Sequence, residues 1–393
     1  LKSLRNRLVF RPLDVERGKM LDLDKICCLN RECKLHKKIA KGNIKSYGSY
    51  TTSNGKHKRL LCKECKKTFS LTKGTAYYRL KKSKKTFDSV AKSCVEGIKN
   101  SVNARINAIS PTTVWRWLIL ASKFSKSFSD KNLRDYTIRE IQADELKTFV
   151  SGKDKESWIY TAMEVSTRLW PSFVLGTRTY RNTMELLSDF QTRGTLDGNQ
   201  ILITTDGFGF YKSVIPKVFS PLAIHAQVIK KIRKNRIVKV DERLIIGTEP
   251  QLKRALADSS DSEKINTSFI ERLNLTLRQG VSYLQRKTSG YSRHSVCLEE
   301  RIFLFQCFYN FIRPHRSLSC KDKVVTPAMA AGITSLPIDF RTIFSFFMPN
   351  LWAVTGSHSS TRGKFVIFEN AQAKALEKQE TLLRDYFEFG LAA

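Results

Sequence analysis

The chain has 393 residues, more than one ordinary hydrophobic core accommodates, which indicates two or three domains. Hydrophobic residues make up 41% of it, enough for globular folding and against wholesale disorder. The formal charge of +33 favours a polyanionic partner, and nucleic acid is the commonest such partner.

The positive charge is concentrated toward the N-terminus. Residues 1–100 contain 27 Lys or Arg against 8 Asp or Glu, which indicates a binding domain rather than a uniformly Lys-rich protein. No apolar run approaches the roughly 18 residues that span a membrane, and arginines interrupt residues 1–13, unlike a secretory signal. We therefore expect a cytoplasmic protein without membrane contact, whose nine cysteines are thiols or metal ligands.

Four cysteines form two closely spaced pairs. Four residues separate the first pair, two separate the second, and 28 lie between the pairs, which are Cys28 with Cys33 and Cys62 with Cys65. Four thiolates at such spacing suit tetrahedral Zn²⁺ in a zinc-ribbon-like module, whose small core needs the metal to fold. Cys27 competes with Cys28 as a ligand, and four free cysteines are the alternative. Asn54-Gly55, between the pairs, predicts a hairpin turn.

Residues 76–130 predict helices, because apolar side chains recur there at helical spacing. Ser110 and Pro111 suit the N-cap and first position of a helix, and the preceding turn resembles that of a helix-turn-helix. The residues expected to face DNA at the start of this second helix are Thr112, Thr113 and Arg116. An ordinary helical hairpin is the alternative; the flanking basic residues and the neighbouring cysteines favour DNA binding.

Strand-like runs follow a predicted linker at 131–138. They are Ile138–Phe149, Trp158–Val165, Pro171–Gly176, Gln200–Thr205 and Ala223–Ile229. Helical patterns at Asn182–Arg193 and Tyr211–Phe219 fall between the later strands. This order predicts a mixed sheet flanked by helices.

The remaining segments are less regular. Residues 250–265 are charged and rich in Ser and Asp, which predicts a loop, whereas 266–280 and 294–313 predict helices. Beyond residue 319 the role of the chain is unclear, although Asn370–Phe389 has the pattern of an amphipathic helix.

Three acidic residues stand where metal ligands are expected. Asp144 lies on the first predicted strand, and Asp206 ends the apolar strand before Gly207, where a ligand can approach closely. Because alternate strand residues face opposite ways, we expect Asp144 and not Glu145 to enter the site. Glu271 lies near the start of a predicted helix. Such carboxylates can hold a pair of Mg²⁺ ions for phosphodiester chemistry, although each acid taken alone suits a cap or turn.

Arg278 lies two helical turns after Glu271, so both project from nearly the same face. A cation there can contact the phosphate beside the metals. A solvated surface arginine is the alternative.

Taken together, these motifs resemble the DDE transposases of prokaryotic insertion sequences, in the branch with an N-terminal zinc ribbon and helix-turn-helix. The resemblance covers about residues 25–333, and it is carried by residues 28–33 and 62–65 around the cysteines, 110–118, 143–146, 205–208, 271–274, 309–316 and 326–329. Two departures stand out. Leu29 and Arg31 occupy positions where relatives often have proline, and the 65 positions from Asp206 to Glu271 need an additional loop or strand.

The resemblance implies a multidomain α+β and α/β protein. Its predicted parts are an N-terminal extension (1–24), a zinc-ribbon-like module (25–75), a helix-turn-helix domain (76–130), a ribonuclease H-like, integrase-like catalytic core (139–318) and a C-terminal tail (319–393). It also implies a metal-binding triad with a neighbouring basic residue, which correspond to Asp144, Asp206, Glu271 and Arg278.

The expected cofactors are two Mg²⁺ (or Mn²⁺) ions per active site and structural Zn²⁺. The expected partners are double-stranded DNA, as inverted-repeat ends and target, and further copies of the chain in a nucleoid-associated homo-oligomer. Two alternatives remain: a non-catalytic zinc and helix-turn-helix regulator, and a structure-specific nuclease with the same core.

Overall fold

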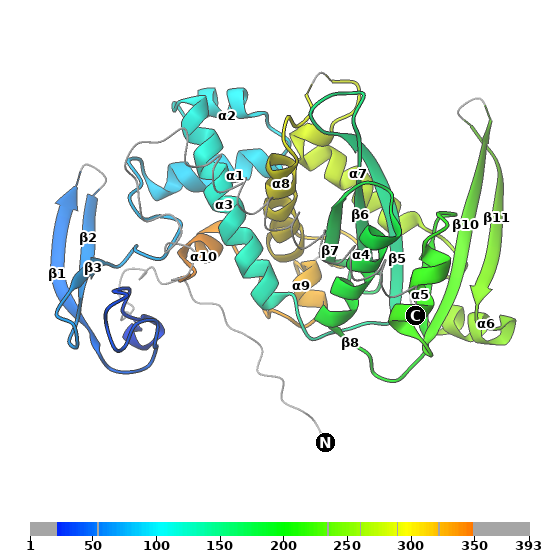
Figure 1. Ribbon diagram of the computed structural model, residues 1–393, viewed down its shortest axis with the longest axis horizontal. Helices are drawn as coiled ribbons and strands as arrows, with labels where there is room; N and C mark the ends of the chain where they lie inside the picture. The colour runs from blue at the N-terminus through cyan, green and yellow to red at the C-terminus, as the bar shows by residue number, and fades with distance from the viewer. Residues whose placement is uncertain are drawn as a thin grey trace, which may run out of the picture. The chain divides into compact units, whose positions relative to one another are not determined.

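The computed structural model describes residues 22–52, 55–233, 236–259, 261–288, 290–320 and 323–348, which belong to one compact unit ending at Met348. This unit contains a small three-stranded sheet, a group of helices and a six-stranded sheet with helices packed on it (Figure 1). The helix predicted at Asn370–Phe389, and most of the predicted N-terminal extension, lie outside the described residues.

The small sheet carries two of the four paired cysteines at or near strand ends. A 3₁₀-helix η1 (Leu23–Lys25) precedes it, and its antiparallel strands have the order β1-β2-β3. These strands are β1 (Ile44–Thr52), β2 (Gly55–Cys62) and β3 (Thr68–Ser70). Thr52 lies opposite Gly55, so the predicted hairpin is confirmed.

Three helices follow: α1 (Lys84–Val95), α2 (Asn100–Ile106) and α3 (Pro111–Asn132). Ser110 caps α3 by accepting the Thr113 N–H at 3.2 Å, as the sequence predicts. However, α3 continues past the predicted border at 130. The linker expected at 131–138 is wrong, because Leu133, Tyr136 and Ile138 are almost fully buried.

The larger sheet has the order β11-β10-β9-β5-β6-β7. Strands β5, β6 and β7 are antiparallel neighbours, whereas β9 and β10 run parallel to β5, so the sheet is mixed as predicted. The strands are β5 (Glu140–Phe149), β6 (Glu156–Glu164), β7 (Leu169–Gly176), β9 (Ile201–Thr205), β10 (Ala223–Arg233) and β11 (Arg236–Ile246). Two-residue strands β4 (Tyr136–Thr137) and β8 (Gly194–Thr195) pair separately.

Helices connect and cover the strands. They are α4 (Tyr180–Arg193), α5 (Tyr211–Phe219), α6 (Glu249–Asp258), α7 (Ser268–Gly280), α8 (Ser295–Cys307), α9 (Pro327–Ala330) and α10 (Phe340–Ser345), with short helical turns η2 (Ser282–Leu284) and η3 (Phe308–Ile312). Helix α5 has the predicted bounds. The loop predicted at 250–265 is wrong at its start, because α6 lies there and buries Leu252 against β9 and β10.

Two elements of the larger sheet extend beyond the prediction. Strand β10 continues to Arg233, and the unpredicted β11 pairs with it as an antiparallel edge strand. This hairpin fills part of the long separation between Asp206 and Glu271 that the sequence showed. The additional structure is therefore a strand pair and a helix, not one open loop.

The beginning of the predicted tail is folded. Helix α10 buries Phe340, Ile343 and Phe344, and the ring of Phe344 packs edge-on against Phe87 of α1 at 5.2 Å between centroids. Residues 327–348, which fall within the predicted tail of 319–393, thus contribute buried side chains to the core.

Candidate functional site

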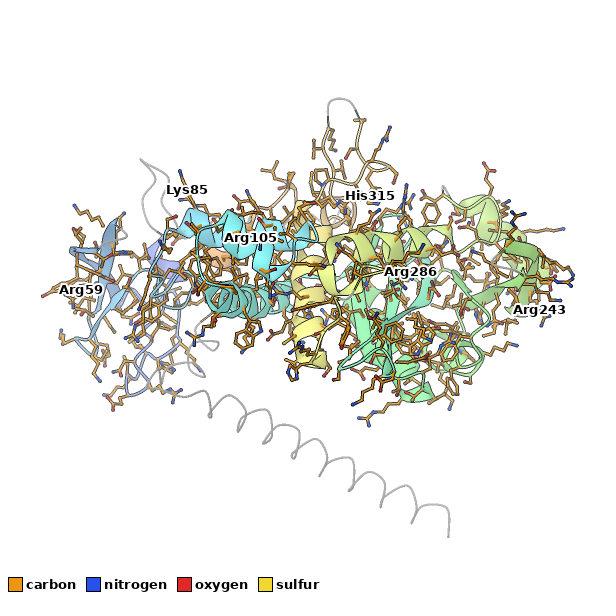
Figure 2. All side chains as sticks on the ribbon, turned by 90° about the horizontal axis from the view of Figure 1, so that it is seen from above. Arg59, Lys85, Arg105, Arg243, Arg286 and His315 are labelled. Carbon is orange, nitrogen blue, oxygen red and sulfur yellow. The ribbon has the colours of Figure 1, made fainter. Side chains whose placement is uncertain are left out.

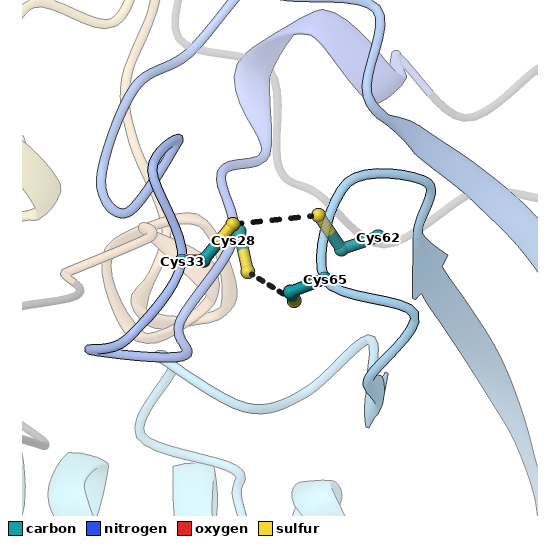
Figure 3. A group of neighbouring side chains, drawn as sticks. All are labelled: Cys28, Cys33, Cys62 and Cys65. Atoms are coloured by element: carbon teal, nitrogen blue, oxygen red, sulfur yellow. Dashed lines mark hydrogen bonds between the residues drawn. The ribbon is translucent and has the colours of Figure 1, made fainter.

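The four paired cysteines converge into one cluster. Their sulfurs lie within 4.8 Å of one another, with 3.6 Å between Cys28 and Cys65 and 3.9 Å between Cys33 and Cys62 (Figure 3). A tetrahedron of Zn–S bonds of about 2.3 Å spaces its sulfurs about 3.8 Å apart. The cluster therefore fits a tetrahedral metal ion such as zinc, and the separations are too long for disulfides.

The surroundings of the cluster favour the thiolate form of one of its cysteines, Cys62. Burial opposes ionisation of Cys62, but N–H groups of Cys65 and Glu64 and the Asn43 side chain outweigh it and lower its pKa to about 7. The Asn43 amide donates to the Cys62 sulfur at 3.2 Å. Burial raises the pKa of Cys28, so in the absence of a cation this thiol stays protonated. A bound metal ion would reverse that preference.

The geometry also selects between the two adjacent cysteines. Cys28 belongs to the cluster, whereas Cys27 is buried outside it. The question that spacing left open is thus answered in favour of Cys28.

A second cluster forms at one end of the parallel strands. Asp144 lies on β5 and Asp206 follows the last residue of β9, the strand that pairs with β5. The strands are parallel, so both carboxylates emerge at the same edge of the sheet. Oxygens of Asp144, Asp206 and Glu145 lie within 4.8 Å of one another, close enough to share a metal ion.

Helix α7 is fixed to the face of β5 that carries Asp144. The Gln142 Oε1 accepts the N–H groups of Phe269 and Ile270 at 3.0 and 3.1 Å, which satisfies the first turn of the helix. One turn after Glu271, Asn274 donates to Asp144 Oδ2 at 2.9 Å. The hydrogen bonds of Gln142 and Asn274 thus hold α7, which carries Glu271, against the strand that carries Asp144.

Glu145 is a correction to the prediction. Its side chain projects from the opposite face of β5, yet its fully buried carboxylate lies close to that of Asp206. This is possible because Asp206 lies beyond the end of β9, where its side chain is accessible from both faces of the sheet. Arg178 donates to Glu145 at 2.7 Å and lies 4.0 Å from Asp206. Its guanidinium is stacked between Trp158 and Phe208, each ring centroid 4.2 Å away.

Local sequence patterns carry only weak signals for these partners. Arg178 follows β7 in no recognisable motif, and only the folded chain brings it to Glu145. Asn274 was within reach of prediction, since it lies three residues after Glu271 and therefore on nearly the same helical face.

Glu271 lies beside the cluster of three acids. Its Oε1 accepts the Thr267 hydroxyl at 2.5 Å and forms an ion pair with Lys230 of β10. Its charge reaches Asp144 and Asp206, adding to the effect of their burial on the pKa of each. Glu271 therefore lies near the two aspartates, but its carboxylate, held by Lys230, is not one of the three whose oxygens lie within 4.8 Å of one another.

Arg278 donates to the backbone carbonyls of Lys147 at 3.1 Å and Leu284 at 3.4 Å. Burial, with repulsion from Arg286, lowers its pKa to about 10. Its observed contacts tie the end of α7 to β5. Arg278 thus holds the end of α7, the helix that carries Glu271, in place.

The acidic site holds more negative charge than its surroundings stabilise. Burial and the charge of Asp206 raise the pKa of Asp144 to about 6 and that of Glu145 to about 7. Burial also raises the pKa of Asp206. Carboxylates that repel one another in this way suit a cation of high charge and oxygen preference, such as Mg²⁺ or Mn²⁺.

The start of α3 presents two of the three predicted DNA-facing residues to solvent. Thr112 and Arg116 are exposed, whereas Thr113 is half-buried and its hydroxyl pairs with Ser110 at 2.9 Å. Leu118 is fully buried and Trp117 packs on Phe87, as expected of the inward face. Thr113 therefore supports the helix start, which leaves Thr112 and Arg116 for an external contact.

In comparisons with known proteins, no family model matches the chain and no curated protein matches it significantly. Among the described residues, no helix combines the length and apolar character that crossing a bilayer requires.

Proposed function

We propose that this chain is a DDE transposase that binds the terminal inverted repeats of an insertion sequence and catalyses metal-dependent DNA cleavage and strand transfer. The observation that carries the proposal is the meeting of Asp144 and Asp206 at one sheet edge, with Glu271 beside them on α7. These residues are far apart in sequence, and the resemblance to DDE transposases assigns metal binding to the same three.

The acidic side chains have distinct roles in this proposal. Asp144, Asp206 and Glu271 would hold two Mg²⁺ or Mn²⁺ ions, which when bound supply an activated water and stabilise charge on the phosphate during in-line displacement. Asn274 orients Asp144 by its hydrogen bond. Arg178 offsets the charge of Glu145 and Asp206 before the ions bind, and Lys230 does so for Glu271.

DNA recognition is assigned to the N-terminal modules. The cysteine cluster would hold structural Zn²⁺, and Thr112 and Arg116 at the start of α3 would contact the element end. The excess of basic residues in 1–100 supports phosphate contacts. The proposal includes a homo-oligomer that brings two DNA ends together in the nucleoid of a prokaryotic cell.

The test compares Asp206→Asn with Asp258→Asn, an exposed carboxylate of α6. The substrate is a labelled duplex that carries the DNA flanking the coding sequence, incubated with and without Mg²⁺. We expect Asp206→Asn to reduce Mg²⁺-dependent nicking by a factor of about 1,000 or more while leaving duplex binding intact, and Asp258→Asn to behave as wild type.

Two results would count against the proposal. Nicking retained by Asp206→Asn removes this residue from catalysis. A wild-type protein that binds the duplex but never cuts it favours the non-catalytic regulator, while equal cutting of unrelated RNA–DNA hybrids favours a structure-specific nuclease.

A further inference from the structure

Strands β10 and β11 continue beyond the packed part of the larger sheet as a two-stranded ribbon, which we call the β10–β11 arm (residues 230–233 and 236–240). Strand β10 is buried from Ala223 to Val228, whereas the described side chains from Lys230 to Val240 are exposed. Figure 1 shows the two strands of the arm as a long hairpin, with α5 and α6 beside its lower part. A two-stranded ribbon without a core of its own is only marginally stable in water.

The base of the arm is firmly anchored. Ile224, Ala226 and Val228 of β10 pack in a buried cluster with Leu252 of α6, and Leu244 of β11 joins them. Lys230, the first arm residue, forms an ion pair with Glu271 of the acidic site. The arm therefore begins at the candidate catalytic centre.

The arm is strongly basic. Its residues 230–233 and 236–240 contain five Lys or Arg and no Asp or Glu. Across the hairpin, Arg233 lies opposite Arg236 and Lys231 opposite Lys239. Like charges in directly opposite positions destabilise a strand pair. One carboxylate, Asp241, pairs with both lysines, and among the described residues neither arginine has an acidic partner.

These features identify the kind of partner. The pairs of like-charged side chains on this exposed ribbon would be stabilised by closely spaced negative charges. The phosphates of a DNA duplex provide such charges. A two-stranded ribbon also matches the width of the major groove. Arg243, labelled in Figure 2, continues the exposed basic side of β11 toward its base.

A second copy of the chain is the competing occupant, because β11 is an edge strand with exposed Val238 (61%) and Val240 (48%). Pairing two arms edge to edge would bring two sets of uncompensated arginines together, which disfavours it.

We propose that the β10–β11 arm is a DNA-binding element that grips duplex phosphates beside the acidic site. The proposal rests on the proposed function, since it assigns to the arm the duplex that this site would cut or join. The duplex is the element's own end or the target DNA, and the experiment separates these two sources.

The test uses the full chain with Arg233→Ala and Arg236→Ala combined. The charge-preserving control combines Arg233→Lys and Arg236→Lys, and the matched surface control combines Lys253→Ala and Arg254→Ala on α6, where both side chains are exposed. Binding is measured by fluorescence anisotropy without Mg²⁺, from 50 to 200 mM KCl. One probe is a random-sequence 30-base-pair duplex and the other carries the DNA flanking the coding sequence.

We expect the double alanine variant to bind at least about tenfold more weakly at 50 mM KCl. The slope of log K against log salt should become shallower by about 2, one for each lost phosphate contact. The lysine variant and the α6 variant should keep the wild-type slope. Weaker binding of both probes would mean that the arm binds any duplex, including target DNA. Weaker binding of the flanking probe alone would mean that the arm binds the end of the element.

Unchanged binding of both probes by the alanine variant would overturn the proposal for the arm. So would a change of molar mass in light scattering with DNA affinity intact, which would make the arm a contact between copies. In either case Mg²⁺-dependent nicking by the wild type would still support the proposed function. Failure of the wild type to bind either duplex would instead overturn both.

Discussion

At the scale of single residues, three neighbouring carboxyl groups repel one another: Glu145 is buried, and Asp144 and Asp206 are partly buried. Burial first, and then the charge of Asp206, raise the pKa of Asp144 to about 6 and of Glu145 to about 7. Arg178 offsets only part of this charge. A site of this kind binds protons when it has no metal ion, so protons and divalent cations compete for the same oxygens.

The competition predicts pH-dependent Mg²⁺ binding. At pH 8 Asp144 and Glu145 are mostly ionised, whereas at pH 5.5 both are mostly protonated. We expect Mg²⁺ to raise the melting temperature clearly at pH 8, and its affinity to be lower by about tenfold or more at pH 5.5. Differential scanning fluorimetry with a Mg²⁺ titration at both values measures this.

The metal-free protein should show the opposite trend. Since the folded-state pKa values are raised, the stability contributed by these groups is fully present below about pH 4 and is lost as pH rises through 6 to 7.

For the Mg²⁺ titration, Asp144→Asn combined with Asp206→Asn serves as the control and should abolish the Mg²⁺ response at both pH values. An equal Mg²⁺ response of the wild type at pH 5.5 and 8 would contradict the prediction.

At the scale of elements, local patterns predicted most of the larger sheet. Strand-like runs predicted β5, β6, β7, β9 and the first part of β10, and the signal is clearest for β9, whose five residues are all buried. Strand β11 was missed, since its exposed, charged residues carry no such signal. Helix α6 was missed for a related reason: one buried leucine is too little periodicity, although Thr248 and Gln251 form its capping box.

The candidate site was predictable where it depends on strand ends. Asp144 and Asp206 stood out because each accompanies a buried strand. The alternation rule then excluded Glu145 wrongly, because it applies within a strand and Asp206 lies past the end of one. The ion pairs of Arg178 and Lys230 depend on tertiary packing, which no local pattern records.

The cysteine cluster leads to a prediction about metal content. Cys62→Ser removes a thiolate that accepts hydrogen bonds from Asn43 and neighbouring N–H groups, and should abolish stoichiometric zinc binding. The small core around the cluster includes Ile44, Leu60 and Phe69, and we expect the metal to stabilise it, so this module should also lose its ordered structure. Inductively coupled plasma mass spectrometry gives the zinc content per chain.

Cys27→Ala is the matched control, because Cys27 is buried next to the cluster in sequence yet contributes no sulfur to it. It should retain one zinc ion per chain. Loss of zinc from the Cys27 variant, or retention by the Cys62 variant, would show that a different ligand set holds the metal.

At the scale of the whole molecule, the segment 340–348 connects parts of the chain that are distant in sequence. Phe344 packs on Phe87 of α1, its carbonyl accepts the Ala76 N–H at 3.0 Å, and the Met348 N–H donates to the Gly74 carbonyl at 2.8 Å. Phe347 packs against the core of the cysteine module. The segment is thus shared between the module with the cysteines and the helices that follow it.

This shared position predicts a large effect of Phe344→Ala. The ring is fully buried, stacks on Phe340 with centroids 5.2 Å apart and meets Phe87 edge-on at the same distance. Its removal leaves a cavity between α10 and α1, so we expect the free energy of unfolding to fall by about 3–5 kcal/mol. Urea unfolding followed by circular dichroism measures the change.

The control is Leu336→Ala, because the Leu336 side chain is 68% exposed, and it should change the free energy of unfolding by less than about 0.5 kcal/mol. Equal effects of the two substitutions would mean that α10 does not pack on α1 in solution, and that the region after 335 is a tail after all.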